Sequence, residues 1–161
     1  MKIKRISLAA LAFAAVFAGL SLPTPARAGG REVPPDALRC LALAVYFEAR
    51  GEPREGKAAV AHVVLNRARA AGFPAGVCQV VRQGGEQRPC QFGWWCDGRS
   101  DQPAPGRMWE SSQDVAREVL AGQVQDPTEG ALYFMPVRAK QPTWTERLTR
   151  VARIGGHVFY R

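Results

Sequence analysis

Two glutamates one helical turn apart, Glu48 and Glu52, are the residues of this chain best placed to do chemistry. Glu48 continues an apolar stripe of Leu38, Leu41 and Val45, whose spacing of three to four residues places them on one face of a helix. Burial raises the pKa of a carboxyl group, so an acid on such a face can stay protonated near neutral pH. The same position also suits a helix-end glutamate that pairs with a nearby arginine or faces solvent.

A helix–corner–helix unit must position these two acids. Gly51 can end the first helix in a left-handed conformation, and Pro53 suits the first turn of the next one. We therefore expect one helix over residues 37–50 and a second over 53–71, with both glutamates at the corner between them. Glu52 is expected to point toward the N-terminus of the second helix, where a negative charge is stabilised.

The corner and the helix after it resemble the SleB-type cell wall hydrolases, the spore cortex-lytic enzyme family. The resemblance lies in three stretches: Glu48–Pro53 with Gly56, Ala59–Ala61 and Val64–Arg67; Cys90–Trp94 with Cys96–Gly98; and Ile154–Tyr160. It extends over residues 36–160, nearly the whole chain after its N-terminal leader. It implies a lysozyme-like or lytic-transglycosylase-like single domain that acts on peptidoglycan glycan strands without a cofactor.

Cleavage of the β-1,4 bond between MurNAc and GlcNAc needs an acid that protonates the leaving oxygen, and most glycosidases add a second carboxylate. The resemblance implies a lytic transglycosylase, in which one glutamate serves as acid and then as base while the muramic 6-hydroxyl attacks C1. Glu48 is the expected acid. A hydrolytic muramidase, a catalytically silent peptidoglycan-binding protein and an envelope protein that binds protein partners remain alternatives; Glu52, Asp97 and Asp101 are the other nearby acids.

The candidate substrate-binding residues are three aromatic side chains near polar turns and one amide: Gln91, Trp94, Tyr133 and Trp144. Exposed aromatic rings suit stacking on sugars, although each could equally pack in the core. Gln91 matches the Gln-Phe pair of the family pattern. His157 follows a Gly-Gly pair and could support the site, but a structural role is favoured.

The N-terminus predicts export. Three basic residues, an apolar run over residues 6–20 and the small residues around Ala28 indicate a secretory signal over residues 1–28, with an uncleaved anchor as the alternative. Residues 29–161 would then form the catalytic domain in the periplasm or cell envelope, as a monomer without a stable membrane span. Removing four basic residues lowers the net charge from +8 to +4, with 18 basic against 14 acidic residues. The sequence contains no basic run with interleaved aromatic residues, which is the pattern that would indicate nucleic-acid binding.

Four cysteines in a small exported domain favour two disulfides. Three pairings are possible, and we expect Cys78–Cys90 together with Cys40–Cys96. A metal site is not expected, because no C-x-x-C pair occurs and the two histidines lie far from the cysteines in sequence.

The overall pattern predicts an α+β fold that is mainly helical. A third helix is expected over residues 108–121. Residues 149–154 and 157–160, joined by Gly155 and Gly156, predict a small C-terminal β-hairpin. Residues 77–81 could form a strand or one helical turn, and residues 131–134 form a short apolar segment.

Overall fold

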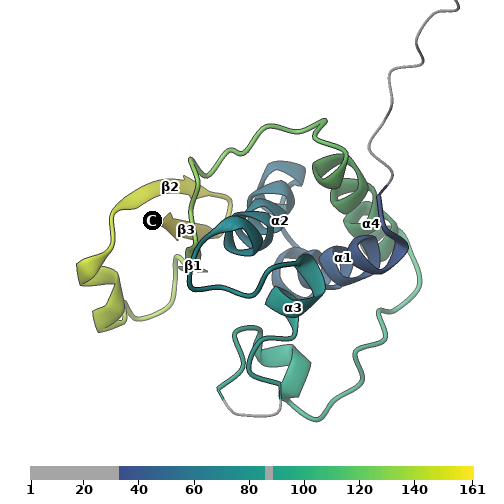
Figure 1. Cartoon of the computed structure of the whole chain (residues 1–161), viewed down its shortest axis with the longest axis horizontal. Coiled ribbons are helices and arrows are strands. Elements are labelled where there is room, and N and C mark those ends of the chain that lie inside the picture. Colours follow the sequence, from purple (N-terminus) through teal and green to yellow (C-terminus); the bar gives the residue numbers. More distant parts are fainter. Residues whose placement is uncertain (1–32, 86–88) are drawn as a thin grey trace, which may run out of the picture.

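A computed structural model describes residues 33–85 and 89–161, so the predicted signal segment lies outside the described residues (Figure 1). The elements follow one another as α1 (Pro35–Ala49), α2 (Arg54–Arg69), α3 (Val77–Val81), the 3₁₀ turn η1 (Gly93–Cys96), α4 (Arg107–Leu120), β1 (Tyr133–Pro136), the 3₁₀ turn η2 (Thr143–Arg147), β2 (Arg150–Ile154) and β3 (His157–Tyr160). Within this part of the chain, no helix is both long and apolar enough to cross a membrane.

The main core lies between the helices. Helix α1 is buried without interruption from Cys40 to Tyr46, and it packs against α2, α3 and α4. Small side chains such as Ala42 and Ala44 let the neighbouring helices approach α1 from several sides. A helix that is apolar on nearly all faces is buried at the centre of a small domain. Because its neighbours hold α1 on several sides, the C-terminal end of α1 has a fixed position.

Helix α2 connects this core to the sheet. Figure 1 shows α2 between the three strands on one side and α1 and α4 on the other. Its side chains Ala58 and Val64 pack in the helical core, whereas Ala59 and Val63 pack against Phe159 of β3. Residues on α2 can therefore reach both the end of α1 and the sheet.

The sheet confirms the predicted C-terminal hairpin and adds a strand to it. Strands β2 and β3 pair antiparallel around Gly155, whose φ of 56° is in the left-handed region that glycine adopts without strain. Strand β1 pairs on the other side of β3, with Tyr133 opposite Tyr160, to give the order β1-β3-β2. The short apolar segment at residues 131–134 thus leads into an edge strand, while central β3 is buried throughout.

The helices agree with the sequence predictions to within two residues at each end, and the ambiguous segment at residues 77–81 is a helix. A short apolar run does not distinguish a buried strand from a helical turn by periodicity. Here packing of α3 against α1 and α2 decides the outcome. The α+β, mainly helical class is confirmed.

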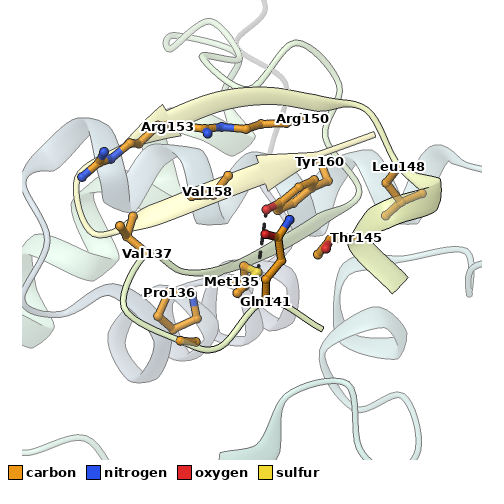
Figure 2. Close-up of a pocket in the computed structure, with 11 residues that line it drawn as sticks. Met135, Pro136, Val137, Gln141, Thr145, Leu148, Arg150, Arg153, Val158 and Tyr160 are labelled. Atoms are coloured by element: carbon orange, nitrogen blue, oxygen red, sulfur yellow. Dashed lines mark hydrogen bonds between the residues drawn. The ribbon is translucent and has the colours of Figure 1, made fainter. Parts of the chain in front are cut away.

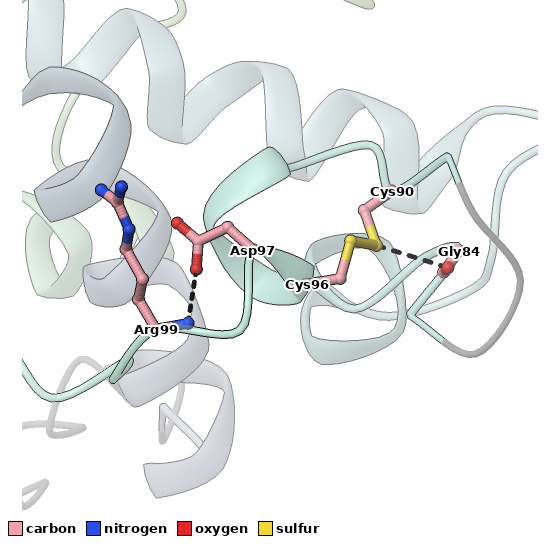
Figure 3. Close-up of a disulfide and its surroundings, with 5 residues drawn as sticks. All are labelled: Gly84, Cys90, Cys96, Asp97 and Arg99. Carbon is pink, nitrogen blue, oxygen red and sulfur yellow. Dashed lines mark hydrogen bonds between the residues drawn. A yellow bond between two sulfur atoms is a disulfide. The ribbon is translucent and has the colours of Figure 1, made fainter.

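The cysteines form two disulfides, as expected, but the predicted pairing is wrong. The bonds are Cys40–Cys78, with a Cα–Cα distance of 5.3 Å, and Cys90–Cys96, with a Cα–Cα distance of 6.4 Å. Packing of α3 on α1 brings Cys78 to Cys40. The 3₁₀ turn η1 curls the chain so that Cys96 returns to Cys90, as Figure 3 shows. Both Cα separations lie in the range that a disulfide can span.

Candidate active site

Glu48 lies near the C-terminal end of α1, where aromatic rings surround the half-buried side chain. The ring of Phe47 stacks on Trp94 at 4.6 Å between centroids, and Tyr46 meets Phe47 edge to face at 5.1 Å. The Tyr46 hydroxyl accepts a hydrogen bond from the backbone N–H of Ala104 at 3.2 Å, which ties the loop before α4 to this helix end. The carboxyl group therefore sits in a largely apolar setting.

Burial raises the pKa of the Glu48 carboxyl above its usual value, because an apolar setting disfavours the ionised form. The positive charge of Arg67 and the indole N–H of Trp94 each act in the opposite direction and lower this pKa, but burial is the larger effect. The Trp94 Nε1 atom is itself buried and meets no acceptor at standard hydrogen-bond geometry within the described residues. Glu48 is therefore an acid biased toward its protonated form, with two donors available to stabilise it once it ionises.

Arg67, on α2, is the buried cation beside this acid. Its Nε donates to the Leu132 carbonyl at 2.6 Å, and its guanidinium lies 5.5–5.6 Å from the ring centroids of Phe73, Phe92 and Tyr133. Burial lowers the pKa of Arg67, while Tyr133 and Glu48 raise it, and a guanidinium stays charged at neutral pH. The Nη1 atom is buried and has no hydrogen-bond partner among the described residues, so one donor of this cation is left unsatisfied within the protein.

Arg67 also lines a cavity of about 310 Å³ that brings together three of the predicted substrate-binding residues. Its walls are Arg67, Gln91, Tyr133, Phe134 and Trp144. Tyr133 and Trp144 continue into a second cavity of about 290 Å³, next to η2. Glu48 does not line either cavity, and its electrostatic contact with Arg67 links it to the first.

Trp94, the fourth predicted substrate-binding residue, lies apart from the other three. It stacks on Phe47 and packs against the helical core, and it does not line the two cavities. The structure therefore places Trp94 near Glu48, and it places Gln91, Tyr133 and Trp144 at the groove that the two cavities form. These roles of all four residues stay predictions.

Glu52 lies beside the first turn of α2, as expected, because its Oε2 is 3.2 Å from the position that a Cβ on Gly56 would take. It forms no side-chain cap on that helix, and its Oε2 accepts a hydrogen bond from the Gly156 N–H at 2.8 Å. A Cβ on Gly155 would approach this carboxylate to within 2.0 Å, so the Gly-Gly turn lets Glu52 come this close. Glu52 thus connects the helix corner to the hairpin, 104 residues away in sequence.

His157 is buried at the start of β3, and its role stays a prediction. Its Nδ1 lies 3.8 Å from Glu52 Oε1, and its ring meets Phe134 edge to face at 5.4 Å. Burial lowers the pKa of His157, and the nearby Glu52 partly offsets this effect. His157 therefore lies next to Glu52 and lines neither of the two cavities.

Asp97, one of the two loop acids named from the sequence, has a local role. Its Oδ1 accepts a hydrogen bond from the Arg99 N–H at 2.8 Å, which forms a tight turn after the Cys90–Cys96 disulfide (Figure 3). Neither cavity carries a carboxylate among its described lining residues.

Arg67 is the site residue that sequence reasoning did not assign to function. In the sequence analysis it stands only within the Val64–Arg67 stretch that carries the family resemblance. A charged residue at a buried helical position is a signal that could have identified it, because such groups are seldom buried without a partner.

The mainly helical α+β domain has a lysozyme-like fold, and the candidate acid Glu48 lies at a helix end near a cavity lined by aromatic rings. The model of the cell wall hydrolase family matches residues 51–160. The chain belongs to this family. Its fold is also similar to the crystal structure of the catalytic domain of the Bacillus cereus SleB protein, with a TM-score of 0.66 and 30% identity over 81% of this chain and 94% of that one.

A second solved structure is similarly close. The catalytic domain of the germination-specific lytic transglycosylase SleB from Bacillus anthracis superposes with a TM-score of 0.65 at 30% identity, over 81% of this chain and 98% of that one. Among curated proteins, the chain is 38% identical over 125 residues to the spore cortex-lytic enzyme of Bacillus subtilis and 35% identical over 124 residues to that of Oceanobacillus iheyensis. The matches cover 76% of this chain but only 36% and 40% of those two relatives.

Proposed function

We propose that this protein is an exported enzyme that cleaves the β-1,4 bond between MurNAc and GlcNAc in peptidoglycan as a lytic transglycosylase, with Glu48 as its single acid and base. The observation that carries the proposal is the state of Glu48: a carboxyl group with a raised pKa that faces a buried cation, beside cavities whose described walls hold no other carboxylate. Membership of the cell wall hydrolase family supports the substrate, and the likeness to a solved lytic transglycosylase supports the reaction.

The proposed reaction uses the carboxyl group of Glu48 twice. Protonated Glu48 gives its proton to the glycosidic oxygen as the bond from that oxygen to C1 breaks, and the GlcNAc end leaves as an alcohol. The 6-hydroxyl oxygen of the same MurNAc then bonds to C1, and the Glu48 carboxylate takes up the hydroxyl proton. The product carries a 1,6-anhydro ring, and Glu48 returns to its protonated form.

Arg67 and Trp94 act on the ionised form of Glu48. Both lower the pKa of this carboxyl, so they stabilise the carboxylate that exists between the two proton transfers. Burial favours the protonated form before and after the reaction. Burial outweighs these two effects and keeps the pKa of Glu48 above its usual value, which suits a group that must first act as an acid.

The groove formed by the two cavities would hold the glycan. Trp144 has 38% of its surface exposed, and its ring lies 5.8 Å from Tyr133, so the pair offers an aromatic platform for a sugar ring. Gln91 adds a polar group at the same cavity. The predicted signal over residues 1–28 would deliver the enzyme, as a monomer, to the periplasm or cell envelope, where such strands lie.

The test is product analysis. The exported chain, purified with its disulfides, is incubated with purified peptidoglycan, and the soluble fragments are identified by mass spectrometry. Anhydro-muramic ends, formed in the presence of EDTA and absent with Glu48→Gln, support the proposal. Reducing ends identify a hydrolytic muramidase. Binding without release of fragments indicates a silent glycan-binding protein. If the protein shows no binding and no release, a role on peptidoglycan is refuted.

A further inference from the structure

A third hollow lies on the face of the sheet that is turned away from α2. It has a volume of about 380 Å³, and its walls come from all three strands and from η2 (Figure 2). Met135, Val158 and Tyr160 form an apolar floor, a cluster separate from the one that packs Phe159 against α2. The sheet thus uses one face to hold the fold together and leaves part of the other face hollow.

Two arginines of β2 line this hollow. Figure 2 shows Arg150 and Arg153 along the strand, next to Val158 and Tyr160 of β3. Both side chains are exposed, and neither forms an ion pair with a described residue. No aspartate or glutamate is among the described residues that line the hollow. Two unpaired guanidinium groups over an apolar floor make a site for an anion that carries an aliphatic group.

The hollow continues the groove proposed for the glycan. It shares Leu148 with the cavity next to η2, and the ring of Trp144 lies 5.6 Å from that of Tyr160 in its wall. Each of the three cavities contains arginine: Arg67 in the first, Arg147 in the second, and the β2 pair in the third. A path that starts beside Glu48 therefore becomes more positive toward the hollow, and its described walls carry no opposite charge.

The sugar rings of a glycan strand are uncharged, so they do not explain this charge. Where muramic acid carries a peptide stem, its own lactyl carboxyl is held in an amide bond, so the nearest anionic groups to the rings are the carboxylates of the stem. We propose that Arg150 and Arg153 bind a stem-peptide carboxylate of the strand being cleaved, so that the enzyme prefers glycan whose muramic residues bear peptides. The inference rests on the proposed function, and it assigns to the outer face of the sheet a substrate-selecting role separate from the acid.

Arginine suits this task because its planar guanidinium matches a carboxylate with two parallel N–H donors. The apolar floor would receive the aliphatic part of a stem residue, and Gln141 adds a polar side chain at the wall. An exposed ion pair contributes little to binding, because water and salt screen its charges. We therefore expect the two arginines together to change kcat/KM by about fivefold, without affecting the chemical step.

The test compares two substrates and three proteins. The first substrate is purified peptidoglycan, and the second is the same material with its carboxyl groups converted to amides, which keeps the glycan and the peptide length but removes the charge. The proteins are the wild type, the double variant Arg150→Gln/Arg153→Gln, and the matched control Arg39→Gln/Arg107→Gln, which removes the same charge from exposed positions on α1 and α4. The readout is the initial rate of fragment release at limiting substrate.

Amidation should slow the wild type and the control about fivefold, and it should leave the β2 double variant unchanged at the lower rate. Equal rates of wild type and β2 variant on native peptidoglycan would overturn the inference while leaving the proposed function intact. A β2 variant that remains sensitive to amidation would also overturn it. If a glycerol phosphate polymer competes for the wild type but not for the β2 variant, and amidation has no effect, the hollow binds phosphate instead and the inference is wrong. Absence of fragment release by the wild type would refute the proposed function itself.

Discussion

Replacing Glu52 by glutamine should weaken the fold and leave the chemistry in place. The Gly156 N–H donates to Glu52 Oε2 at 2.8 Å, and a hydrogen bond to a charged group contributes about 1.5–3 kcal/mol. A glutamine oxygen can still accept this bond, but a neutral pair contributes about 0.5–1.5 kcal/mol. The contact with His157 is 3.8 Å long, and burial lowers the pKa of that histidine, so it adds little at pH 7.

The expected loss for Glu52→Gln is therefore about 1 kcal/mol of unfolding free energy. For a domain of this size, it corresponds to a decrease of roughly 4 °C in Tm. The rate of fragment release should stay within about threefold of wild type, since Glu52 faces the hairpin turn. Glu48→Gln should give the opposite result, with a loss of at least about 10²-fold in rate from a folded protein.

Thermal unfolding and fragment release, measured on the same preparations, separate the two roles. Glu129→Gln is a matched control, because Glu129 is exposed in a turn and only its backbone carbonyl, not its side chain, forms a hydrogen bond with a described residue. It should change neither quantity. If Glu52→Gln removes turnover at an unchanged Tm, and the wild-type products carry reducing ends, Glu52 is a second catalytic carboxylate and the single-acid mechanism is wrong.

Three further outcomes are expected. Because burial raises the pKa of Glu48, the folded protein keeps the carboxyl proton at pH values where the unfolded chain has lost it, so the wild type loses stability as pH rises from about 4.5. Glu48→Gln avoids this loss. Measured by urea unfolding, it should therefore be more stable than wild type between pH 4.5 and 7, with no gain below pH 4. In the chain-entropy account, removing the Cys40–Cys78 disulfide, with a sequence separation of 38, should lower the free energy of unfolding by about 4 kcal/mol. Removing Cys90–Cys96, with a separation of 6, should lower it by about 2 kcal/mol. Equal losses would contradict that account. Trp144→Ala should raise KM about tenfold with little change in kcat or Tm, and an unchanged KM would remove Trp144 from the glycan groove.

The candidate acid could be found from sequence because its setting is local. Leu41 and Val45 place Glu48 on the buried face of one helix by spacing alone, and Gly51 and Pro53 mark the corner where that helix stops. The Gly-Gly pair marks the C-terminal hairpin in the same way. Each of these signals lies within about ten residues of the feature that it predicts.

The pairing of β1 with β3, the partners of the four cysteines and the contact of Glu52 with Gly156 could not be read in this manner. Apart from the Cys90–Cys96 bond, each joins segments whose approach depends on how the helices pack, and several packings satisfy the same local pattern. The Cys90–Cys96 bond is the instructive case: its cysteines are only six residues apart, yet whether they meet depends on the 3₁₀ turn between them.

By itself, the sequence determined a mainly helical α+β domain, the helix corner with Glu48, the hairpin and an even set of cysteines. Only the tertiary structure decided that Arg67 faces Glu48, that Tyr133 and Trp144 share one groove, and that Arg150 and Arg153 line a hollow continuous with it. The physical reason is distance along the chain. Helix periodicity and turn geometry act between neighbours, whereas the charge and solvation around an acid depend on side chains that packing brings from elements far away in sequence.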